Sequence, residues 1–308
     1  MSGVRDARVL VTGATGLIGR QLIPMLGQAE VVAVSRFPHE DSEGVRWVAV
    51  DLSEPGGALG LVTSVRPEVV IHLAGSVRGD RSLDAVTPTL MTNLVSGVEL
   101  LEAATRVGCR RIVWSGSLLE EPAAYRPFPV PPSPYGASRW AASGYARMFH
   151  ALFQSPVVIL RPSYVYGPGQ DSTKLIPHTI RALLEGESPR LGSGTRRLDC
   201  VYATDAARAF CNAVSAVGVE GRTIDIGSGS PSSVRSMVEL IIRLIGPTPG
   251  RPLFGEVPAR PFEQEVGVDV EDAAEALGWR ATTGLEDGLR ATVEWFRDAH
   301  RRAPAPTR

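Results

Sequence analysis

Short apolar runs alternate with helical patterns along most of this chain. The apolar runs predict strands over residues 8–12, 30–34, 45–50, 68–73, 111–114, 157–160 and 223–229. Helical spacing of apolar residues predicts helices after the first strand and over residues 87–107, 174–186, 232–245 and about 284–296. Because strands alternate with helices, we expect a parallel, doubly wound α/β sheet. Its functional site should lie at the carboxyl ends of the strands.

The order of these elements predicts two parts, with no separable linker and no internal repeat. Residues 1–170 are expected to form a larger Rossmann part, to which a segment at about 200–230 returns. Residues 171–199 and 231–300 are expected to form a smaller C-terminal α/β cap. The stretch 301–308 is rich in proline and arginine and predicts a disordered tail.

Composition narrows the range of partners. The 308 residues carry a formal net charge of −1, which gives no electrostatic reason to expect nucleic acid or an anionic membrane as a partner. No apolar run approaches the roughly 20 residues that span a bilayer, and the chain begins without a signal-peptide pattern. We therefore expect a soluble, cytoplasmic protein. The three cysteines and five histidines lack metal-ligand spacing, so no metal site is expected.

A glycine-rich loop joins the first strand to the first helix. Gly13, Gly16 and Gly19 are spaced as G-x-x-G-x-x-G. Glycine allows a tight turn and lets the backbone approach a pyrophosphate, which then lies at the positive end of the helix. The loop predicts a dinucleotide cofactor. Its candidate contacts are Gly13, Thr15, Gly16, Leu17, Ile18 and Gly19.

The end of the second strand bears on which dinucleotide binds. An acidic residue there would accept hydrogen bonds from the 2′-hydroxyl of the adenosine ribose, but this chain has Ser35 and Arg36. A hydroxyl followed by a guanidinium favours a 2′-phosphate, and hence NADP over NAD. The alternative is that Arg36 is an ordinary solvated loop residue. Asp51 and Leu52, after the third strand, are placed to contact the adenine.

Tyr135 and Arg139 are four residues apart in a predicted helix, so they share one face about one turn apart. We expect the cation to lower the pKa of the phenol from its free value of roughly 10 towards neutrality, where proton transfer is useful. The pair alone is weak evidence, because the same spacing occurs by chance on many amphipathic helices.

Several motifs, taken together and in order, resemble one family. They are the glycine loop, His72-Leu73-Ala74-Gly75, Asn93, the serines at 115 and 117, and Tyr135-x-x-x-Arg139. This set is similar to the extended short-chain dehydrogenase/reductases of the nucleotide-sugar epimerase/dehydratase branch. The resemblance covers nearly the whole chain.

The resemblance implies roles for individual residues. Ser117 would polarise a carbonyl, Tyr135 would transfer the proton and Arg139 would take the lysine's place. Further cofactor contacts would come from Leu73, Ala74, Gly75, Asn93, Ser115, Tyr135, Arg139 and Pro162. The cap would bind a nucleotide-linked sugar through Tyr164, Lys174, Arg197 and Arg260. Residues 87–107 and the helix after Tyr135 would form the face of a homodimer.

The chain departs from the family pattern at two positions. Arg139 replaces a lysine, although Lys174 is the only lysine in the chain and arginine has replaced lysine throughout. The family's arginine that contacts the substrate diphosphate falls on Leu198. Arg196 and Arg197 precede it, and we place Arg197 ahead of Arg196 for that role; the alternative is that both lie on a solvated edge.

The residues after Ser117 help to choose the reaction. Dehydratases of this family place an Asp-Glu pair there, whereas this chain has Leu118 and Leu119, which cannot transfer protons. Glu120 and Glu121 would compensate only if the turn differs. Reduction of a 4-keto sugar nucleotide is favoured over 4-epimerisation because Ser35 and Arg36 indicate NADPH. A third interpretation is a non-catalytic NADP-binding sensor, in which Arg139 has replaced the family's lysine.

Overall fold

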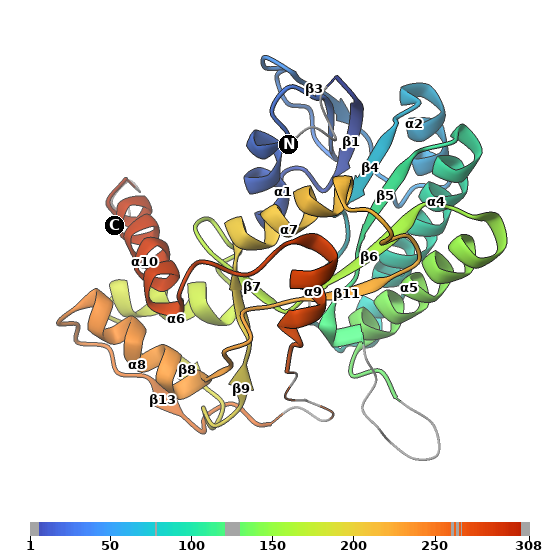
Figure 1. Cartoon of the computed structure of the whole chain (residues 1–308). Coiled ribbons are helices and arrows are strands. Elements are labelled where there is room, and N and C mark those ends of the chain that lie inside the picture. The colour runs from blue at the N-terminus through green and yellow to red at the C-terminus, as the bar shows by residue number, and fades with distance from the viewer. Residues whose placement is uncertain are drawn as a thin grey trace.

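The computed structural model describes residues 6–77, 79–120, 130–259, 262, 265 and 267–302. Its centre is a parallel seven-stranded sheet of strand order β11-β6-β5-β4-β1-β2-β3 (Figure 1). The strands are β1 (Arg8–Thr12), β2 (Glu30–Ser35), β3 (Val45–Ala49), β4 (Val69–His72), β5 (Arg111–Ser115), β6 (Val157–Pro162) and β11 (Thr223–Ile226). The predicted doubly wound sheet is confirmed.

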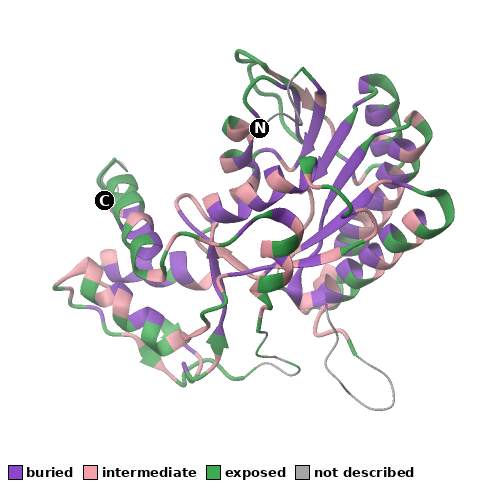
Figure 2. Ribbon diagram, in the orientation of Figure 1, coloured by how far each residue is buried: buried purple, intermediate pink, exposed green. Residues whose placement is uncertain are grey.

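Helices cover both faces of this sheet and form two apolar cores. One face carries α1 (Leu17–Leu22), its 3₁₀ continuation η1 (Ile23–Leu26), α7 (Ala203–Ser215) and α9 (Val270–Leu277). The other carries α2 (Gly57–Val65), α4 (Ser96–Val107) and α5 (Pro134–Phe153). Apart from the edge strands β3 and β11, the strands between these layers are almost wholly buried (Figure 2). The sequence analysis did not identify α2 or α7.

The predicted helix over residues 87–107 is present, but it is not α-helical throughout. It begins as η2 (Leu83–Ala85) and α3 (Val86–Leu90), widens into a π-helical turn η3 (Met91–Val95) and continues as α4. A π-helical turn carries one extra residue and is frequent at functional sites. Asn93 lies in this turn and is fully buried.

The smaller lobe has its own core. It contains α6 (Leu175–Leu184), α8 (Val234–Ile245) and α10 (Leu285–Arg302), packed around apolar residues such as Ile180, Ile241 and Val293. In the described residues it also holds three pairs of short strands: β7 (Tyr164–Tyr166) with β10 (Cys200–Tyr202), β8 (Arg190–Leu191) with β13 (Leu253–Phe254), and β9 (Arg197–Leu198) with β12 (Ser232–Ser233). Figure 1 shows this lobe beside one end of the main sheet.

Two details differ from the boundaries expected from the sequence. Helix α9 and Trp279 lie in the core of the main sheet, not in the smaller lobe, since Ala273, Leu277 and Trp279 belong to its apolar core and α9 packs beside β11 and α7. Helix α10 runs to Arg302, so residues 301 and 302 are helical and not part of a tail. Residues 303–308 lie outside the described part of the chain.

Candidate active site

Arg139 occupies the corner between the ends of β4 and β5. The residue is only 2% exposed. Its Nη1 donates a hydrogen bond of 2.8 Å to the carbonyl of Ser115. A Cβ on Gly75 would lie 2.0 Å from its Nη2, so only glycine fits there. The guanidinium is thus held against the backbone that follows both strands.

Asn93 braces the same corner from the π-helical turn. Its Oδ1 accepts a 2.7 Å bond from the amide of Ser76, and its Nδ2 donates to the Ser76 carbonyl and to Ser138 Oγ, each at 3.0 Å. These three bonds use the side-chain amide fully, apart from spare acceptor capacity. Asn93 therefore ties the loop after β4 to α5.

Tyr135 stands in the first turn of α5. Ser133 caps the helix, since its Oγ accepts a 3.1 Å bond from the Gly136 amide, and Pro134 occupies the first helical position. The ring centroid lies 5.7 Å from Cζ of Arg139. The cap and the proline fix where the helix begins, and so where the phenol stands over the guanidinium.

Ser117 follows β5 in a 3₁₀ turn, η4 (Leu118–Glu120). Its Oγ accepts a 3.2 Å bond from the Leu119 amide, which leaves the hydroxyl proton as a donor. A Cβ on Gly136 would meet the Leu119 carbonyl at 2.8 Å, so the first turn of α5 lies directly against this turn. The structure thereby brings the elements that carry Ser117, Tyr135 and Arg139 to one corner of the sheet.

The glycine loop packs against the end of β4. A Cβ on Gly13, whose φ is +69°, would lie 2.7 Å from the Ala74 amide nitrogen, and one on Gly19 would lie 2.4 Å from the Gly13 carbonyl. These two glycines are therefore required by backbone contact. Thr15 and Gly16 are exposed, while Thr12 Oγ1 accepts a 3.3 Å bond from the Ala74 amide. The accessible turn leaves room for a pyrophosphate, as the cofactor assignment requires.

The predicted contacts after β2 and β3 have separate environments. Ser35 is buried, and its Oγ accepts a 3.2 Å bond from the Phe37 amide, so it organises the turn. Arg36 is exposed, with Cζ 5.9 Å from the Phe37 ring centroid. Hydrogen bonds from Ser53, aided by the charge of Arg36, lower the pKa of Asp51. Leu52 is buried. Arg36 is exposed, so it is the cation that is accessible to a ligand at the end of β2.

The smaller lobe places the two adjacent arginines differently. Arg196 contacts the hydroxyl of Tyr164, and its Cζ lies 5.5 Å from that ring's centroid. Arg197 instead donates a 2.6 Å bond to the Pro231 carbonyl. Leu198, at the position of the family's arginine, is buried in the lobe's core. Arg196, and not the favoured Arg197, is the arginine beside Tyr164.

The other predicted positions of this side are less closely grouped. Lys174, directly before α6, donates a 2.5 Å bond to the carbonyl of Val77 in the loop after β4, and so links the lobe to the main sheet. Pro162 ends β6 and is paired in register with Ile226 of β11. Arg260 lies outside the described residues.

Three acidic residues have hydrogen-bond or ion-pair partners inside the fold that the sequence did not predict. Asp199 accepts bonds from the amides of Ser228 and Gly229 at 2.7 and 2.8 Å and so fixes that loop. Asp205 is paired with Arg208 at 2.7 Å. Glu120 is buried beside Ser117. Burial of acids in such networks depends on chain folding, and no spacing in the sequence marks it.

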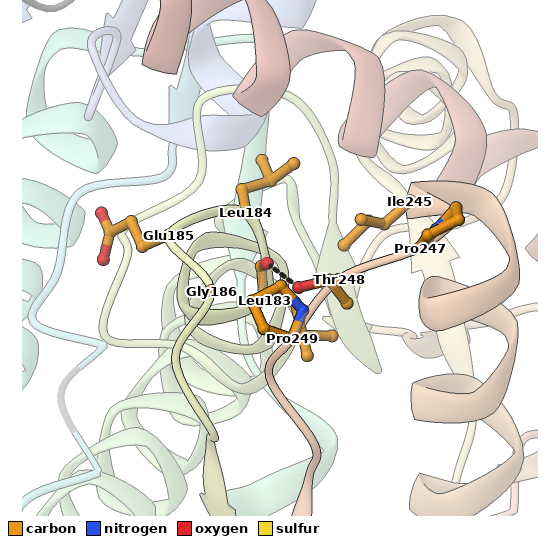
Figure 3. A pocket seen from close by; sticks show the side chains of 8 residues that line it. All are labelled: Leu183, Leu184, Glu185, Gly186, Ile245, Pro247, Thr248 and Pro249. Carbon is orange, nitrogen blue, oxygen red and sulfur yellow. Dashed lines mark hydrogen bonds between the residues drawn. The ribbon is translucent and has the colours of Figure 1, made fainter.

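One cavity of the described structure lies away from the candidate site. It has a volume of about 380 Å³ and lies between the ends of α6 and α8 (Figure 3). Leu183, Ile245 and Pro249 are among its lining residues, and Thr248 Oγ1 donates a 2.7 Å bond to the Leu183 carbonyl across one side. None of the predicted site residues lines it.

Metal-binding clusters and membrane-spanning helices are both absent from the described residues. No group of three or more histidine, cysteine, aspartate or glutamate side chains is arranged to hold a metal ion. Within the same ranges, no helix combines the length and the apolar character needed to cross a membrane.

Comparison with known proteins identifies the family. Residues 9–227 match the model of the NAD dependent epimerase/dehydratase family, and these residues include the glycine loop, Ser117, Tyr135 and Arg139. The chain belongs to this family. The resemblance inferred from the motifs is confirmed, and members of the family include epimerases and dehydratases that act on nucleotide sugars.

Individual relatives align over nearly their whole length. A UDP-glucose 4-epimerase of Mycolicibacterium smegmatis is 31% identical, covering 94% of this chain and 99% of its own. A dTDP-glucose 4,6-dehydratase of Neisseria gonorrhoeae is 28% identical, covering 94% and 95%. Among solved structures, MoeE5 in complex with UDP-glucuronic acid and NAD is 32% identical with a TM-score of 0.83, covering 95% and 99%. The UDP-glucose 4-epimerase of Thermotoga maritima with UDP-glucose has 25% identity and a TM-score of 0.84, covering 95% and 99%.

Proposed function

We propose that this protein is a nucleotide-sugar 4-epimerase that acts on a UDP-linked sugar with a tightly held nicotinamide cofactor. The observation that carries the proposal is the joint placement of Tyr135, Ser117 and Arg139 at one corner of the sheet, in a chain that aligns with 99% of a UDP-glucose 4-epimerase. The two leucines after Ser117 argue against dehydration, and Glu120 is buried and bonded inside the protein.

The residues of this corner divide the chemistry between them. The nicotinamide, when bound, exchanges a hydride with the sugar carbon. Tyr135 takes the proton of the sugar hydroxyl and returns it, and Ser117 keeps its proton and donates a hydrogen bond to the same oxygen. Arg139 places the positive charge of its guanidinium below the phenol, and its bond to the Ser115 carbonyl fixes that position.

Substrate and cofactor recognition rests on more accessible residues. We assign the cofactor pyrophosphate to the turn at Thr15 and Gly16, which is exposed at the start of α1. We assign the substrate diphosphate to Arg196, in preference to Arg197, because Arg196 contacts Tyr164. Lys174 closes the same side through its bond to the loop after β4.

The second candidate is an NADPH-dependent 4-ketoreductase. It is favoured by one observation, the exposed Arg36 at the end of β2 with no acidic residue in the neighbouring position of that strand. A reductase releases its oxidised cofactor after each turnover, and a 2′-phosphate bound by an arginine agrees with use of NADPH.

One assay separates these functions. Purified protein is incubated with UDP-glucose or UDP-galactose and NAD⁺, and the sugar isomers are separated by chromatography. In parallel, a panel of 4-keto-6-deoxy nucleotide sugars is mixed with NADPH, and the absorbance band of reduced nicotinamide is followed. Exchange of isomers without net cofactor change supports the epimerase, and net oxidation of NADPH supports the reductase. Cofactor binding without either reaction supports the sensor.

We also propose that the face made by α3 and α5 joins two copies of the chain. Leu83, Val86, Leu90 and Trp140 are exposed by 40% or more on η2, α3 and α5, and α3 packs beside α5. Size-exclusion chromatography with light scattering tests this: the wild type should run as a dimer, and the double change Leu83→Asp and Leu90→Asp should run as a monomer.

A further inference from the structure

Glu120 is a buried carboxylate that reaches the backbone of the serine turn. It is 1% exposed, and its Oε2 accepts a 2.9 Å bond from Ser143 Oγ and a 3.3 Å bond from the amide of Ser117. A Cβ on Gly116 would lie 3.1 Å from that same oxygen. The carboxylate therefore touches the residue with the predicted catalytic hydroxyl and the one before it.

Helix α5 supplies both attachments of this turn. Arg139 and Ser143 are four residues apart, so they share one face of the helix. Arg139 binds the carbonyl of Ser115 directly, and Ser143 binds the amide of Ser117 through Glu120. The chain is thus held on both sides of Gly116, by the Arg139 cation at the Ser115 carbonyl before it and by the Glu120 carboxyl group at the Ser117 amide after it.

We propose that Glu120 is a positioning residue that sets the place of the Ser117 hydroxyl for reaction, with Ser143 holding the carboxylate. The remaining bonds of the turn are local, from the Leu119 amide to Ser117 Oγ at 3.2 Å and from the Glu120 amide to the Ser117 carbonyl at 3.1 Å. These close the turn on itself. The Glu120 carboxylate ties the Ser117 amide to α5, while the Arg139 bond to the Ser115 carbonyl and the 2.7 Å bond from the Gly116 amide to the Leu160 carbonyl hold the chain just before it.

The charge of Glu120 responds to the groups around it. Burial raises the pKa of Glu120 to about 7, although the bond from Ser143, the charges of Arg161 and Arg139 and the bond from Ser117 oppose this rise. Arg139 faces it from α5, and Arg161 faces it from β6, where Arg161 is paired with Asp225 of β11 at 2.6 Å. An ionised carboxylate makes stronger hydrogen bonds than a neutral one, so ionisation tightens the hold on Ser117.

A comparison of the kinetics of variants tests the positioning role of Glu120. This test rests on the proposed function, because it needs a turnover assay. Glu120→Gln keeps an oxygen acceptor, whereas Glu120→Leu removes it, and Glu102→Gln on the exposed face of α4 is the matched control. Displacing a reacting group by about 1 Å costs up to roughly 100-fold, so we expect Glu120→Leu to lower kcat by about 10- to 100-fold and to leave KM within about threefold. Glu120→Gln should recover most of this loss, and Ser143→Ala should fall between the two.

The pH dependence adds a second readout. Wild-type kcat should rise as Glu120 ionises near pH 7, and that component should be missing in Glu120→Gln. The folded-state pKa is raised above the ordinary value of 4.5, so the stability contributed by the protonated form is complete below that value and is lost as pH rises through about 7. The melting temperature of the wild type should therefore fall more steeply than that of Glu120→Gln between about pH 4.5 and 7, and the two should run in parallel at higher pH.

Hydrogen exchange tests the geometry without reference to any reaction. Mass spectrometry of the peptide covering residues 111–120 should show slow exchange in the wild type and in Glu120→Gln, and faster exchange in Glu120→Leu and Ser143→Ala. The peptide covering β4 should be unchanged in all four. If exchange is faster in Glu120→Leu and Ser143→Ala but the wild type turns over no nucleotide sugar, the proposed function is wrong and the positioning role stands. Unchanged exchange in Glu120→Leu, or wild-type kcat in that variant, would overturn the positioning role.

Discussion

Two arginines assigned to the cofactor site have opposite surroundings. Arg139 is 2% exposed and bonded to the Ser115 carbonyl, with Gly75 packed beneath its guanidinium. Arg36 is exposed at the end of β2. The adjacent Ser35 accepts a hydrogen bond from the Phe37 amide within the turn. The buried arginine is part of the fold before any ligand binds, whereas the exposed one is free to act only on the ligand.

This contrast separates two kinds of change. A substitution near Arg139 alters the geometry of β4, β5 and α5 together, and its effects are coupled to those of its neighbours. A substitution of Arg36 changes the affinity for one phosphate and leaves the fold as it was. The variants that follow test this difference, beginning with the largest expected effect.

Tyr135→Phe should lower turnover by roughly 10²- to 10⁴-fold, since this is the usual contribution of a general acid or base. Cofactor binding should stay nearly unchanged, because the ring and its packing over Arg139 remain. Steady-state kinetics and cofactor titration by fluorescence measure the two effects. Wild-type turnover in this variant would remove Tyr135 from the mechanism.

Gly75→Ala should lower turnover by about 10²-fold, because the new Cβ would lie 2.0 Å from Nη2 of Arg139 and displace the guanidinium. Adding Arg139→Lys should restore part of the activity, since a lysine has no planar fork at that point. Arg139→Lys alone should lose activity, because the bond to the Ser115 carbonyl and the packing on Gly75 are lost. The four kcat values form a double-mutant cycle. Additive effects would contradict the coupling.

Asp205→Ala should lower the free energy of unfolding by about 2 kcal/mol, because a buried carboxylate that accepts bonds from Thr282 and Thr283 is removed. The exposed acid of a surface pair, Glu256, is the control, and Glu256→Ala should change little. Urea unfolding measures both. Equal losses would show that burial does not distinguish these acids.

Acid should reveal the same residue. Burial opposes ionisation of Asp205, but hydrogen bonds from Thr283 and Thr282 and the charge of Arg208 outweigh it and lower the pKa. With a lowered folded-state pKa, its stabilisation is present above the ordinary value of 3.8 and is lost as pH falls through the lowered value. The wild type should therefore lose stability more steeply than Asp205→Asn on acidification below about pH 4.

Arg36→Ala should weaken NADPH binding about tenfold and NADH binding hardly at all, because only NADPH carries the 2′-phosphate. Isothermal titration with both cofactors measures the ratio. Equal losses would remove the argument for NADP and leave the epimerase with NAD as the better proposal.

The sequence predicted the parts of the site that depend on near neighbours along the chain. The glycine loop, the ends of the strands and the spacing of Tyr135 and Arg139 are local patterns, and each strand of the sheet was placed within a few residues. The sequence predicted a helical stretch over residues 87–107 but not its π-helical turn. Asn93 in that turn bonds to Ser76 and Ser138, which lie far from it in sequence, and no local pattern contains such contacts.

The remaining differences come from which way a side chain points. Arg196 and Arg197 are adjacent where β9 begins, and neighbouring residues of an extended chain face opposite sides. Which of them meets Tyr164 depends on pairing with β12, a segment more than thirty residues away. The inward direction of Glu120 likewise depends on Ser143 in α5, so the sequence alone left its role open.

The edge strand β11 has a consequence for how this protein is made. It pairs with β6, yet residues 163–222 of the chain, which include α6 and α7, lie between the two strands. Trp279, which donates a 2.9 Å bond to the Asp205 carbonyl, is buried in the core of the main sheet. During synthesis on the ribosome, the β6 edge that pairs with β11 therefore stays unpaired until β11 has emerged. Exposed strand edges template aggregation, so fragments that end before residue 223 should depend on chaperones to stay in solution.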